Sequence, residues 1–454
     1  MKTSKIALNL TEGKPIKLIL RFAIPVFLGN LFQICYSLVD TKIVGSILGE
    51  DALAAVGSVS ILYTLLTGFF NGLSLGFSVI TARFYGSGEE RKLKENVAGA
   101  ILLGYLTATV LITTVAIFIR PILTLLNVPP QQMDMALSYI TLLVWGMFVT
   151  LAYNLCANTL RAIGDSITPL IFLVIAALTN VAMDYLFILV FHMGVRGAAV
   201  ATMLSQLLSV ALCLNRIRQG FPILHLSREH FALSKKQAIL LYESGLSMGL
   251  MSSLVNFGSL VLQSGINQLG TNIIVAHTAA RKMFEIWGLP VSVLGSSMAT
   301  YCGQNYGAGR YDRIRQGMKS VLILGAVWDG IVFVLAHTIS PYLIRFLTSS
   351  DNEEIIYWGT TYLKVDMSFL LVCLFIVILR NCMQGFGDPK TPILSSFIEL
   401  VGKLVFTFVF VRLFGYWGII WTEPVIWFFM VIPLIVMTLR NPVILEAKKT
   451  DHLV

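Results

Sequence analysis

Charged residues are scarce in this chain of 454 residues: 13% are Asp, Glu, Lys or Arg, against 56% that are hydrophobic. Soluble domains carry about 25% charged residues, so about half of the usual solvating charge is missing. This shortage excludes a soluble globular protein, and the many apolar residues exclude a disordered one. The net charge of +9 lies in short segments between apolar runs. That placement indicates a membrane surface and not a nucleic acid as the partner.

Cysteine and histidine are equally sparse, with six of each. The cysteines lie within or beside apolar stretches and form no CxxC pair, so the sequence predicts neither a disulfide framework nor a metal site. It also lacks the HExxH, GxSxG and phosphate-loop motifs of common hydrolases and ATPases. We interpret the chain as a protein that is not an enzyme and that carries no cofactor.

Long apolar runs take the place of these motifs. A membrane-spanning helix needs about 20 mostly apolar residues. Twelve such runs are centred near residues 32, 68, 108, 147, 179, 206, 253, 287, 331, 369, 403 and 427. The first run begins near Ile16 and shows no cleavage site, which predicts a retained span and not a signal peptide. The sequence therefore predicts an all-α integral membrane protein with twelve transmembrane helices.

Lys and Arg are distributed unevenly between the two sides of this arrangement. An even number of spans places both termini on one side of the membrane. The two tails and the even-numbered loops hold 24 of the 33 Lys and Arg residues, whereas the odd-numbered loops hold four. Because basic residues accumulate in cytoplasmic loops, we predict a multi-pass protein whose termini are both cytoplasmic.

Two loop motifs recur later in the chain at nearly the same offset. Tyr85-Gly86-Ser87-Gly88 returns as Tyr306-Gly307-Ala308-Gly309. Gly164-Asp165-Ser166-Ile167-Thr168-Pro169 returns as Gly387-Asp388-Pro389-Lys390-Thr391-Pro392. Both motifs lie in equivalent loops of the predicted arrangement, so the chain consists of two homologous halves.

Six spans in each half make the two repeats parallel. We predict an N-terminal six-helix bundle over residues 1–226 and a C-terminal six-helix bundle over residues 227–454. Duplicated helical bundles of this kind place their substrate site near the interface of the repeats. They work by alternating access, in which one bundle rocks against the other.

Ionisable residues inside the apolar runs need an explanation, because each costs about 2.5–3.5 kcal/mol at bilayer depth. In the first half, Asp40 lies toward the outer end of the first run. Asp184 lies in the fifth run, four residues after Asn180 and on the same helical face. Two carboxylates and an amide could bind a proton or a small hard cation. The alternative for Asp40 is an ion pair with Lys42 at the membrane edge.

The second half carries acids and bases at helical spacing. Glu399 and Lys403 are four residues apart, and Lys282 and Glu285 are three apart, which favours structural ion pairs. Glu423 precedes a proline that interrupts the helical hydrogen bonds and could open a polar pocket. We therefore expect a charge network in the second half, which we call the C-lobe network. Its role is structural or, alternatively, it takes part in ion coupling. Its candidate members are Glu285, Glu399, Lys403 and Glu423.

Together these features resemble the multidrug and toxic compound extrusion (MATE) family over essentially the whole chain. The motifs that carry the resemblance are Pro25 with Asp40, Ala82-Arg83-Phe84-Tyr85-Gly86 with its echo Gly303-Gln304-Asn305-Tyr306-Gly307, Arg161-Ala162-Ile163-Gly164-Asp165, and Gly197-Ala198-Ala199-Val200-Ala201-Thr202. The resemblance implies a MATE-like fold with an N-lobe and a C-lobe. It also implies export of organic cations and amphipathic drugs in exchange for H⁺ or Na⁺.

Within this family the chain looks like the DinF-like branch, whose cation site lies in the first half. By this resemblance the site residues are Asp40, Asn180, Asp184 and Thr202, with Tyr139 and Asn154 as neighbours. The resemblance also implies that the first helix bends at Pro25 when the site changes protonation state. The NorM-like branch instead builds a site from acids of the seventh and tenth spans, and the regions around Asn256 and Cys373 carry none.

The sequence thus predicts a cation-coupled multidrug antiporter of the bacterial cytoplasmic membrane that works by alternating access. We expect a monomer that binds small drug-like molecules and membrane lipid, with no metal and no nucleic-acid partner. One alternative is a flippase for a lipid-linked oligosaccharide, in which we would expect more basic residues along the cavity. Another is a membrane enzyme such as an acyltransferase, which would need a catalytic histidine or a metal cluster. The acidic first half favours a cationic cargo.

Overall fold

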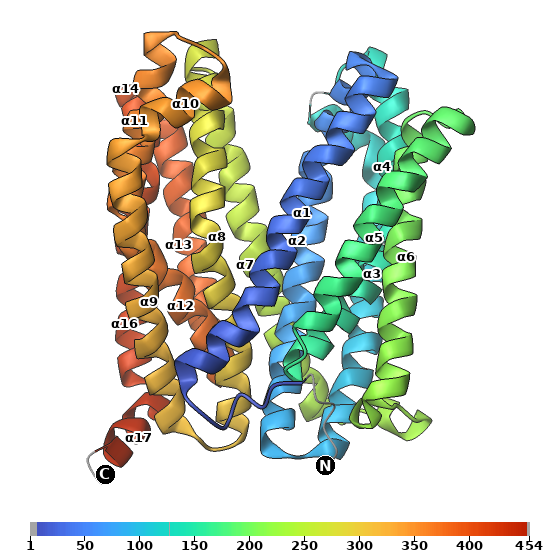
Figure 1. Ribbon diagram of the computed structural model, residues 1–454, viewed down its shortest axis with the longest axis vertical. Coiled ribbons are helices and arrows are strands. Elements are labelled where there is room, and N and C mark those ends of the chain that lie inside the picture. The colour runs from blue at the N-terminus through green and yellow to red at the C-terminus, as the bar shows by residue number, and fades with distance from the viewer. Residues whose placement is uncertain (1–6, 127, 452–454) are drawn as a thin grey trace. The chain divides into compact units, whose positions relative to one another are not determined.

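The computed structural model describes residues 7–126 and 128–451, and the regular structure in this part of the chain is helical (Figure 1). The first half contains α1 (Pro15–Leu48), α2 (Glu50–Ser87), α3 (Glu90–Leu125), α4 (Pro130–Ala162), α5 (Ile167–Tyr185) with the π-helical turn η1 (Leu186–Val190), and α6 (Val195–Gly220). The short 3₁₀ turns η2 (Pro222–Leu224) and η3 (Arg228–Phe231) follow α6.

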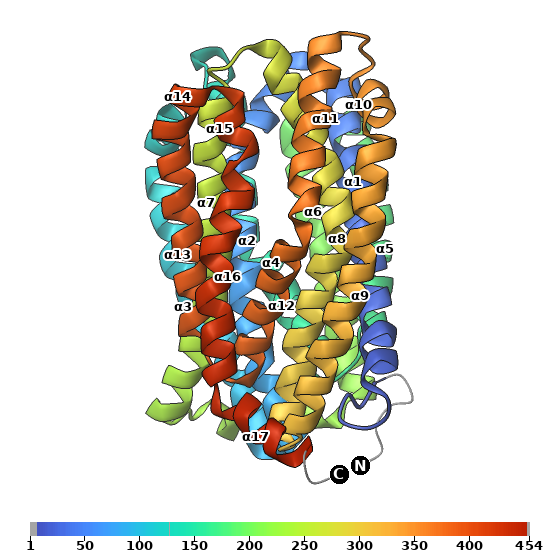
Figure 2. The same cartoon turned by 90° about the vertical axis from the view of Figure 1, so that its left-hand side faces the viewer.

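The second half repeats this series of long helices with more breaks. It contains α7 (Lys235–Ile266), α8 (Thr271–Gly307), α9 (Tyr311–Thr338), α10 (Ser340–Thr348), α11 (Glu353–Ser368), α12 (Leu370–Phe386), α13 (Lys390–Val405), the π-helical turn η4 (Phe406–Phe410), α14 (Val411–Phe414), α15 (Tyr416–Ile420), α16 (Thr422–Arg440) and α17 (Pro442–Asp451). Figure 2 shows α13 and α16 side by side along most of their length.

Every predicted apolar run corresponds to a helix or to helices in series. Within the described residues, ten helices are long and apolar enough to cross a membrane, and α11 with α12 makes an eleventh span bent by 53°. The predicted eighth span coincides with α8, which has 37 residues. It includes Arg281, Lys282 and Glu285, and these charges lower its apolar character below that of the other spans. The all-helical multi-span architecture is confirmed.

The helices group into two compact units. The first unit comprises residues 7–9 and Arg21–Leu250, and the second comprises Leu10–Leu20 and residues 251–451. The first turns of α1 thus belong with the second unit, and the first half of α7 belongs with the first. The predicted bundles, 1–226 and 227–454, divide the sequence at one point, whereas the units exchange these two segments.

Backbone geometry repeats between the halves. Glycines with positive φ occur in four pairs that share nearly one offset: Gly49 and Gly270, Gly88 and Gly309, Gly164 and Gly387, and Gly194 and Gly415. The loops before α5 and α13 also share one device. Asp165 Oδ1 accepts from the Thr168 N–H at 2.9 Å, and Asp388 Oδ1 accepts from the Thr391 N–H at 3.1 Å. The duplication predicted from two loop motifs therefore extends to turns and helix starts.

Two side-chain amides of the Gly303–Gly307 motif bond to the segment that precedes α1. Gln304 Oε1 accepts from the buried Leu10 N–H at 3.0 Å, and Asn305 Nδ2 donates to the Leu10 carbonyl at 3.1 Å. Arg313 Nε in turn donates to Asn305 Oδ1 at 3.0 Å. Since a buried backbone group without a partner costs about 1–3 kcal/mol, these side chains allow the segment before α1 to pack within the second unit.

Close helix packing in the first unit depends on glycine. Ser244 of α7 donates a hydrogen bond to the Gly76 carbonyl of α2 at 2.9 Å. A Cβ atom at Gly76 would collide with the backbone of Ser244, and one at Gly245 would collide with the ring of Phe77. Only glycine lets the two backbones approach so closely. This contact fixes the first half of α7 on the unit that holds the acidic site described below.

Candidate functional site

The acidic site of the first unit is built from five helices. Helix α1 is continuous for 34 residues despite Pro25 in its interior, and it carries Asp40 in its second half. Helices α5 and α6 lie side by side in Figure 1 and supply Asn180, Asp184 and Thr202. Asn180 and Asp184 are fully buried, with no exposed area. The fold therefore buries this acid and this amide away from water, while Asp40 is half-buried.

Two carboxyl groups meet in this site. Those of Asp40 and Asp184 lie within hydrogen-bonding contact of each other. One buried oxygen of each carboxyl has no hydrogen-bond partner among the described residues. No ion pair joins Asp40 to Lys42 in this part of the chain, so the alternative of a local pair at the membrane edge is not what the structure forms. The pair can hold a proton or a small cation between its oxygens.

The Asn180 amide connects the carboxyl pair to its neighbours. In the orientation that satisfies all of its contacts, its nitrogen donates to Asp184 Oδ2 and to the Tyr36 hydroxyl, each at 3.0 Å. Its oxygen then accepts from the Thr202 N–H at 3.0 Å. The amide thus holds α1, α5 and α6 together around the carboxyl groups. An ion bound there would therefore affect the packing of all three helices.

Tyrosine hydroxyls surround the two acids. Tyr36, Tyr63 and Tyr139 all lie close enough to interact with Asp40 electrostatically. Tyr63 also hydrogen-bonds the side chain of Gln206, which accepts from the Thr150 hydroxyl at 2.6 Å. The site therefore contains oxygen and amide groups from α1, α2, α4, α5 and α6.

The structure brings together most of the residues predicted for this site. Asp40, Asn180, Asp184, Thr202 and Tyr139 share one cluster. Asn154 lies one turn beyond Thr150 on α4, and no hydrogen bond joins it to the cluster among the described residues. Sequence reasoning missed Tyr36, Tyr63, Thr150 and Gln206. Tyr36 precedes Asp40 by four residues, a helical spacing that could have indicated it.

The second unit buries a chain of alternating charges instead. Lys403 Nζ donates to Glu399 Oε1 at 2.9 Å and lies 3.2 Å from Glu423 Oε1. Arg380 pairs with Glu399 at 3.3 Å, and Arg281 lies 4.0 Å from Glu423. Each glutamate of this network therefore contacts two cations, which compensates its charge in a buried environment.

The predicted C-lobe network is thus only partly the one observed. Glu285 pairs with Lys282 at 3.1 Å where both side chains are exposed, apart from the buried chain of charges. Sequence reasoning did not include Arg281 and Arg380, because neither lies at helical spacing from Glu399 or Glu423. Asp366, at the end of α11, lies beside Arg281, so the tenth span does contribute an acid.

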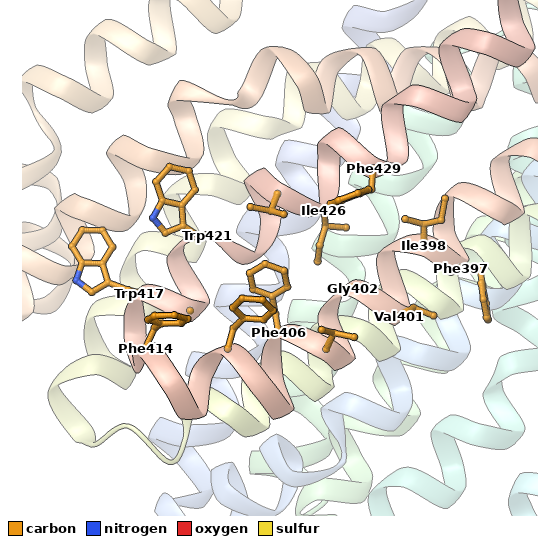
Figure 3. A pocket seen from close by; sticks show the side chains of 14 residues that line it. Phe397, Ile398, Val401, Gly402, Phe406, Phe414, Trp417, Trp421, Ile426 and Phe429 are labelled. Carbon is orange, nitrogen blue, oxygen red and sulfur yellow. The ribbon is translucent and has the colours of Figure 1, made fainter.

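An apolar pocket opens on the second unit (Figure 3). It has a volume of about 950 Å³ and lies between α13, η4 and α14 on one side and α15 and α16 on the other. Aromatic side chains dominate its wall: Phe397, Phe406, Phe410, Phe414, Trp417, Trp421 and Phe429. With no charged side chain in its lining, this pocket suits an apolar chain or ring and not an ion.

Metal chemistry has no site among the described residues. No group of three or more His, Cys, Asp or Glu side chains that could hold a metal ion occurs there. The six cysteines are free thiols. The chemistry that the molecule offers is ion binding by carboxyl oxygens in one unit and ion pairing in the other.

A duplicated bundle of membrane helices with a buried carboxyl site defines the architecture of a secondary transporter. The MatE family model matches residues 25–186 and again residues 248–409. The two matches cover more than half of the chain, so the chain belongs to the MatE family, whose members are membrane transporters. The family resemblance, the duplication and the interpretation that the chain is not an enzyme are confirmed.

Known proteins similar to the chain span nearly its whole length. Probable multidrug resistance protein YoeA of Bacillus subtilis (strain 168) is 26% identical over 407 residues, which are 88% of this chain and 84% of that protein. The FAD transporter of Shewanella oneidensis is 23% identical over 85% of each chain. The crystal structure of MATE in the bent conformation superimposes with a TM-score of 0.88 at 21% identity, over 99% of both chains. This likeness confirms the fold.

Proposed function

We propose that this protein is a cation-coupled antiporter of the DinF-like branch. It exports organic cations and amphipathic drugs in exchange for H⁺ or Na⁺. The observation that carries this proposal is the uncompensated carboxyl pair of the buried Asp184 and the half-buried Asp40, with no cationic side chain bonded to either among the described residues. An acid pair at bilayer depth is costly unless an ion neutralises it. Ion uptake therefore belongs to the working cycle of the first unit.

Direct contact between the carboxyl groups favours H⁺ over Na⁺ as the coupling ion. Two carboxyl groups can hydrogen-bond each other only when one of them carries a proton. Releasing that proton leaves two like charges in contact, which drives the groups apart. Since Asp40 belongs to α1 and Asp184 to α5, proton release changes how these helices pack. Pro25 gives α1 a place to bend, because its ring removes one helical hydrogen bond.

Charge also selects the cargo. Once its two acids are deprotonated, the site attracts a cationic or neutral amphipathic compound and repels an anion. The similar protein named for multidrug resistance fits this expectation better than the FAD transporter does, because FAD is a dianion. We therefore assign drug-like organic cations as substrates and place a flippase of anionic lipid-linked sugars second.

The test is ethidium efflux from proteoliposomes under a proton gradient or a sodium gradient imposed separately. We expect the proton gradient to drive uphill efflux by the parent protein. Asp184→Asn should show none, while Asp51→Asn, an exposed acid at the start of α2, should match the parent. Uphill efflux by Asp184→Asn at the parental rate would overturn the assignment. FAD transport that ethidium does not inhibit would overturn the cationic cargo.

We further place the protein as a monomer in the bacterial cytoplasmic membrane with both termini cytoplasmic. The excess of Lys and Arg in the tails and even-numbered loops supports this orientation. A fluorescent protein fused to the C-terminus should be bright, because such fusions fold in the cytoplasm. We also propose that transport needs no cofactor beyond the coupling ion.

A further inference from the structure

The duplicated helices give the two buried clusters a common register. Helix α5 begins at Ile167 and α13 at Lys390, and each beginning carries the same Asp and Thr hydrogen bonds. Asn180 lies as far along α5 from its start as Lys403 lies along α13 from its own. These two residues therefore occupy equivalent positions of the repeat.

A second pair of equivalent positions lies on the neighbouring helices. Gly194 and Gly415 share one backbone conformation, with φ of 60° and 55° and ψ of −145° and −134°. Thr202 follows Gly194 at the same spacing as Glu423 follows Gly415. The contact of Asn180 with Thr202 in the first unit is thus replaced by the contact of Lys403 with Glu423 in the second.

Lys403 is held as a bound ion would be. Its ammonium lies 2.9 Å from Glu399 Oε1, 3.2 Å from Glu423 Oε1 and 3.2 Å from the Ser259 hydroxyl, and its side chain is 2% exposed. An ammonium has three donors, and three oxygens receive them here. A Cβ atom at Gly258 would approach Lys403 Cδ to 2.9 Å, so the glycine makes room for the methylene stem.

We propose that the Lys403 ammonium is a tethered cation, which stands where the first unit has the Asn180 amide and which permanently neutralises Glu399 and Glu423 in place of an exchangeable ion. This inference rests on the proposed function only in its reading of the first unit as an ion site. It assigns coupling to the ion site of the first unit alone, because the two glutamates of the second unit are already neutralised by the chain itself. It also assigns the second unit a specific ligand class: once the tether is removed, the site should bind a small primary ammonium.

The test removes the tether and supplies the ion separately. Lys403→Ala deletes three carbons and the ammonium, which together have the composition of n-propylammonium. We expect the purified variant in detergent to lose on the order of 10 °C of melting temperature, because two buried glutamates lose a partner. Added n-propylammonium chloride should restore at least half of that loss along a saturable curve.

Three controls make the test selective. n-Propanol fills the same volume without charge, and tetramethylammonium chloride supplies charge and ionic strength without primary N–H donors; neither should restore stability. Lys282→Ala removes a lysine from an exposed pair on α8, so n-propylammonium should not affect its melting temperature. Restoration that does not saturate, or that n-propanol matches, would overturn the tethered cation.

A second variant keeps the proposal testable if Lys403→Ala does not accumulate. Lys403→Met retains most of the stem and removes only the ammonium, so a cavity is not the cause of any change. We expect it to be destabilised to a similar degree, and a stability equal to that of the parent would overturn the proposal. Neither readout involves transport. If n-propylammonium does not restore stability, the tethered cation is overturned and the proposed ion site of the first unit is unaffected. If Asp184→Asn still transports at the parental rate, the proposed function is overturned, and the n-propylammonium experiment still tests the tethered cation separately.

Discussion

The two units carry polar clusters that share two equivalent positions of the repeat, Asn180 with Lys403 and Thr202 with Glu423, but they balance charge differently. In the first unit, Asp40 and Asp184 meet with no Lys or Arg bonded to them in the described part of the chain. In the second, Glu399 and Glu423 each contact two cations. Because an uncompensated carboxylate at bilayer depth is costly, the proposed function has the first unit take its counter-charge from an exchanged ion, whereas the second unit supplies its own cations.

This difference teaches how one duplicated scaffold can divide its work. A cluster that needs an external ion changes state whenever the ion leaves, which suits coupling. A cluster that supplies its own cations keeps one state and stabilises the unit around it. Substitutions in the two clusters should therefore have opposite consequences: lost transport with intact stability in the first unit, and lost stability in the second.

The largest expected effect is on transport by Asp184→Asn. The amide keeps the size of the carboxyl group but cannot take up or release a proton, so uphill efflux should fall to the level of empty liposomes. Removing a buried charge should leave the melting temperature within about 2 °C of the parent. Efflux under an imposed proton gradient and thermal unfolding of the same preparation measure both quantities.

A stability loss as large as that of a core truncation would contradict this prediction. It would mean that the carboxyl pair holds the first unit together and does not exchange an ion. Asp51→Asn, at the exposed start of α2, is the matched control for the substitution itself and should change neither quantity.

The next largest effect is on the stability of the second unit. The pairing within the network predicts which second substitution restores part of the stability that Lys403→Met loses. Lys403→Met leaves one negative charge in excess. Adding Glu423→Gln removes that excess and leaves Arg281 beside Asp366, whereas adding Glu399→Gln deprives Arg380 of its partner. We expect the pair with Glu423→Gln to regain about half of a loss on the order of 10 °C, and the pair with Glu399→Gln to lose more.

Thermal unfolding of the two double variants checks this order directly. It also distinguishes the network from an isolated Glu399–Lys403 pair, in which removing both residues would leave no lone charge. The structure adds Arg380 to Glu399, so a lone charge does remain. If Glu399→Gln compensates better, the order of partners within the network is different from the one described here.

Much of the fold could be predicted from the sequence because the membrane imposes it. Apolar runs separated by charged turns leave few arrangements besides helices in series. The repeat could be predicted because glycines such as Gly88 and Gly309 occupy backbone conformations that other residues rarely adopt. The breaks at η1 and η4 could not be predicted, because a π-helical turn has no residue signature in an apolar run.

The candidate site was predictable where chemistry is unusual and unpredictable where it is ordinary. An acid such as Asp184 in an apolar run stands out by its cost. Tyr63 and Gln206 do not stand out, because such side chains are common in membrane helices. Only the packing of α4 against α2 and α6 brings them to the acids. The apolar pattern places Arg380 in a loop, and its pairing with Glu399 depends on how α12 packs against α13.

A smaller effect is expected for Pro25→Ala, which tests whether the site acts through the shape of α1. Alanine restores the helical hydrogen bond that proline removes, so a straight helix gains stability relative to a bent one. We expect turnover to fall roughly tenfold, which corresponds to about 1.4 kcal/mol, with little change in the affinity for ethidium. Pro121→Ala, which also replaces a proline inside a helix, is the control. Unchanged turnover would exclude bending at Pro25 and leave the carboxyl pair unaffected.

The smallest expected effect is that of Tyr36→Phe, which removes one hydroxyl from the edge of the site. Without it the Asn180 amide loses one of the two acceptors of its nitrogen and keeps Asp184. One hydrogen bond contributes about 1 kcal/mol, so the proton concentration that gives half-maximal transport should shift about fivefold. The maximal rate should be retained, because both carboxyl groups remain. Tyr185→Phe, on the exposed side of α5, should cause no shift. Complete loss of transport would mean instead that the Tyr36 hydroxyl carries the proton itself. The coupling site would then extend beyond the two acids, and the contrast with the second unit would rest on a hydroxyl as well as on charge.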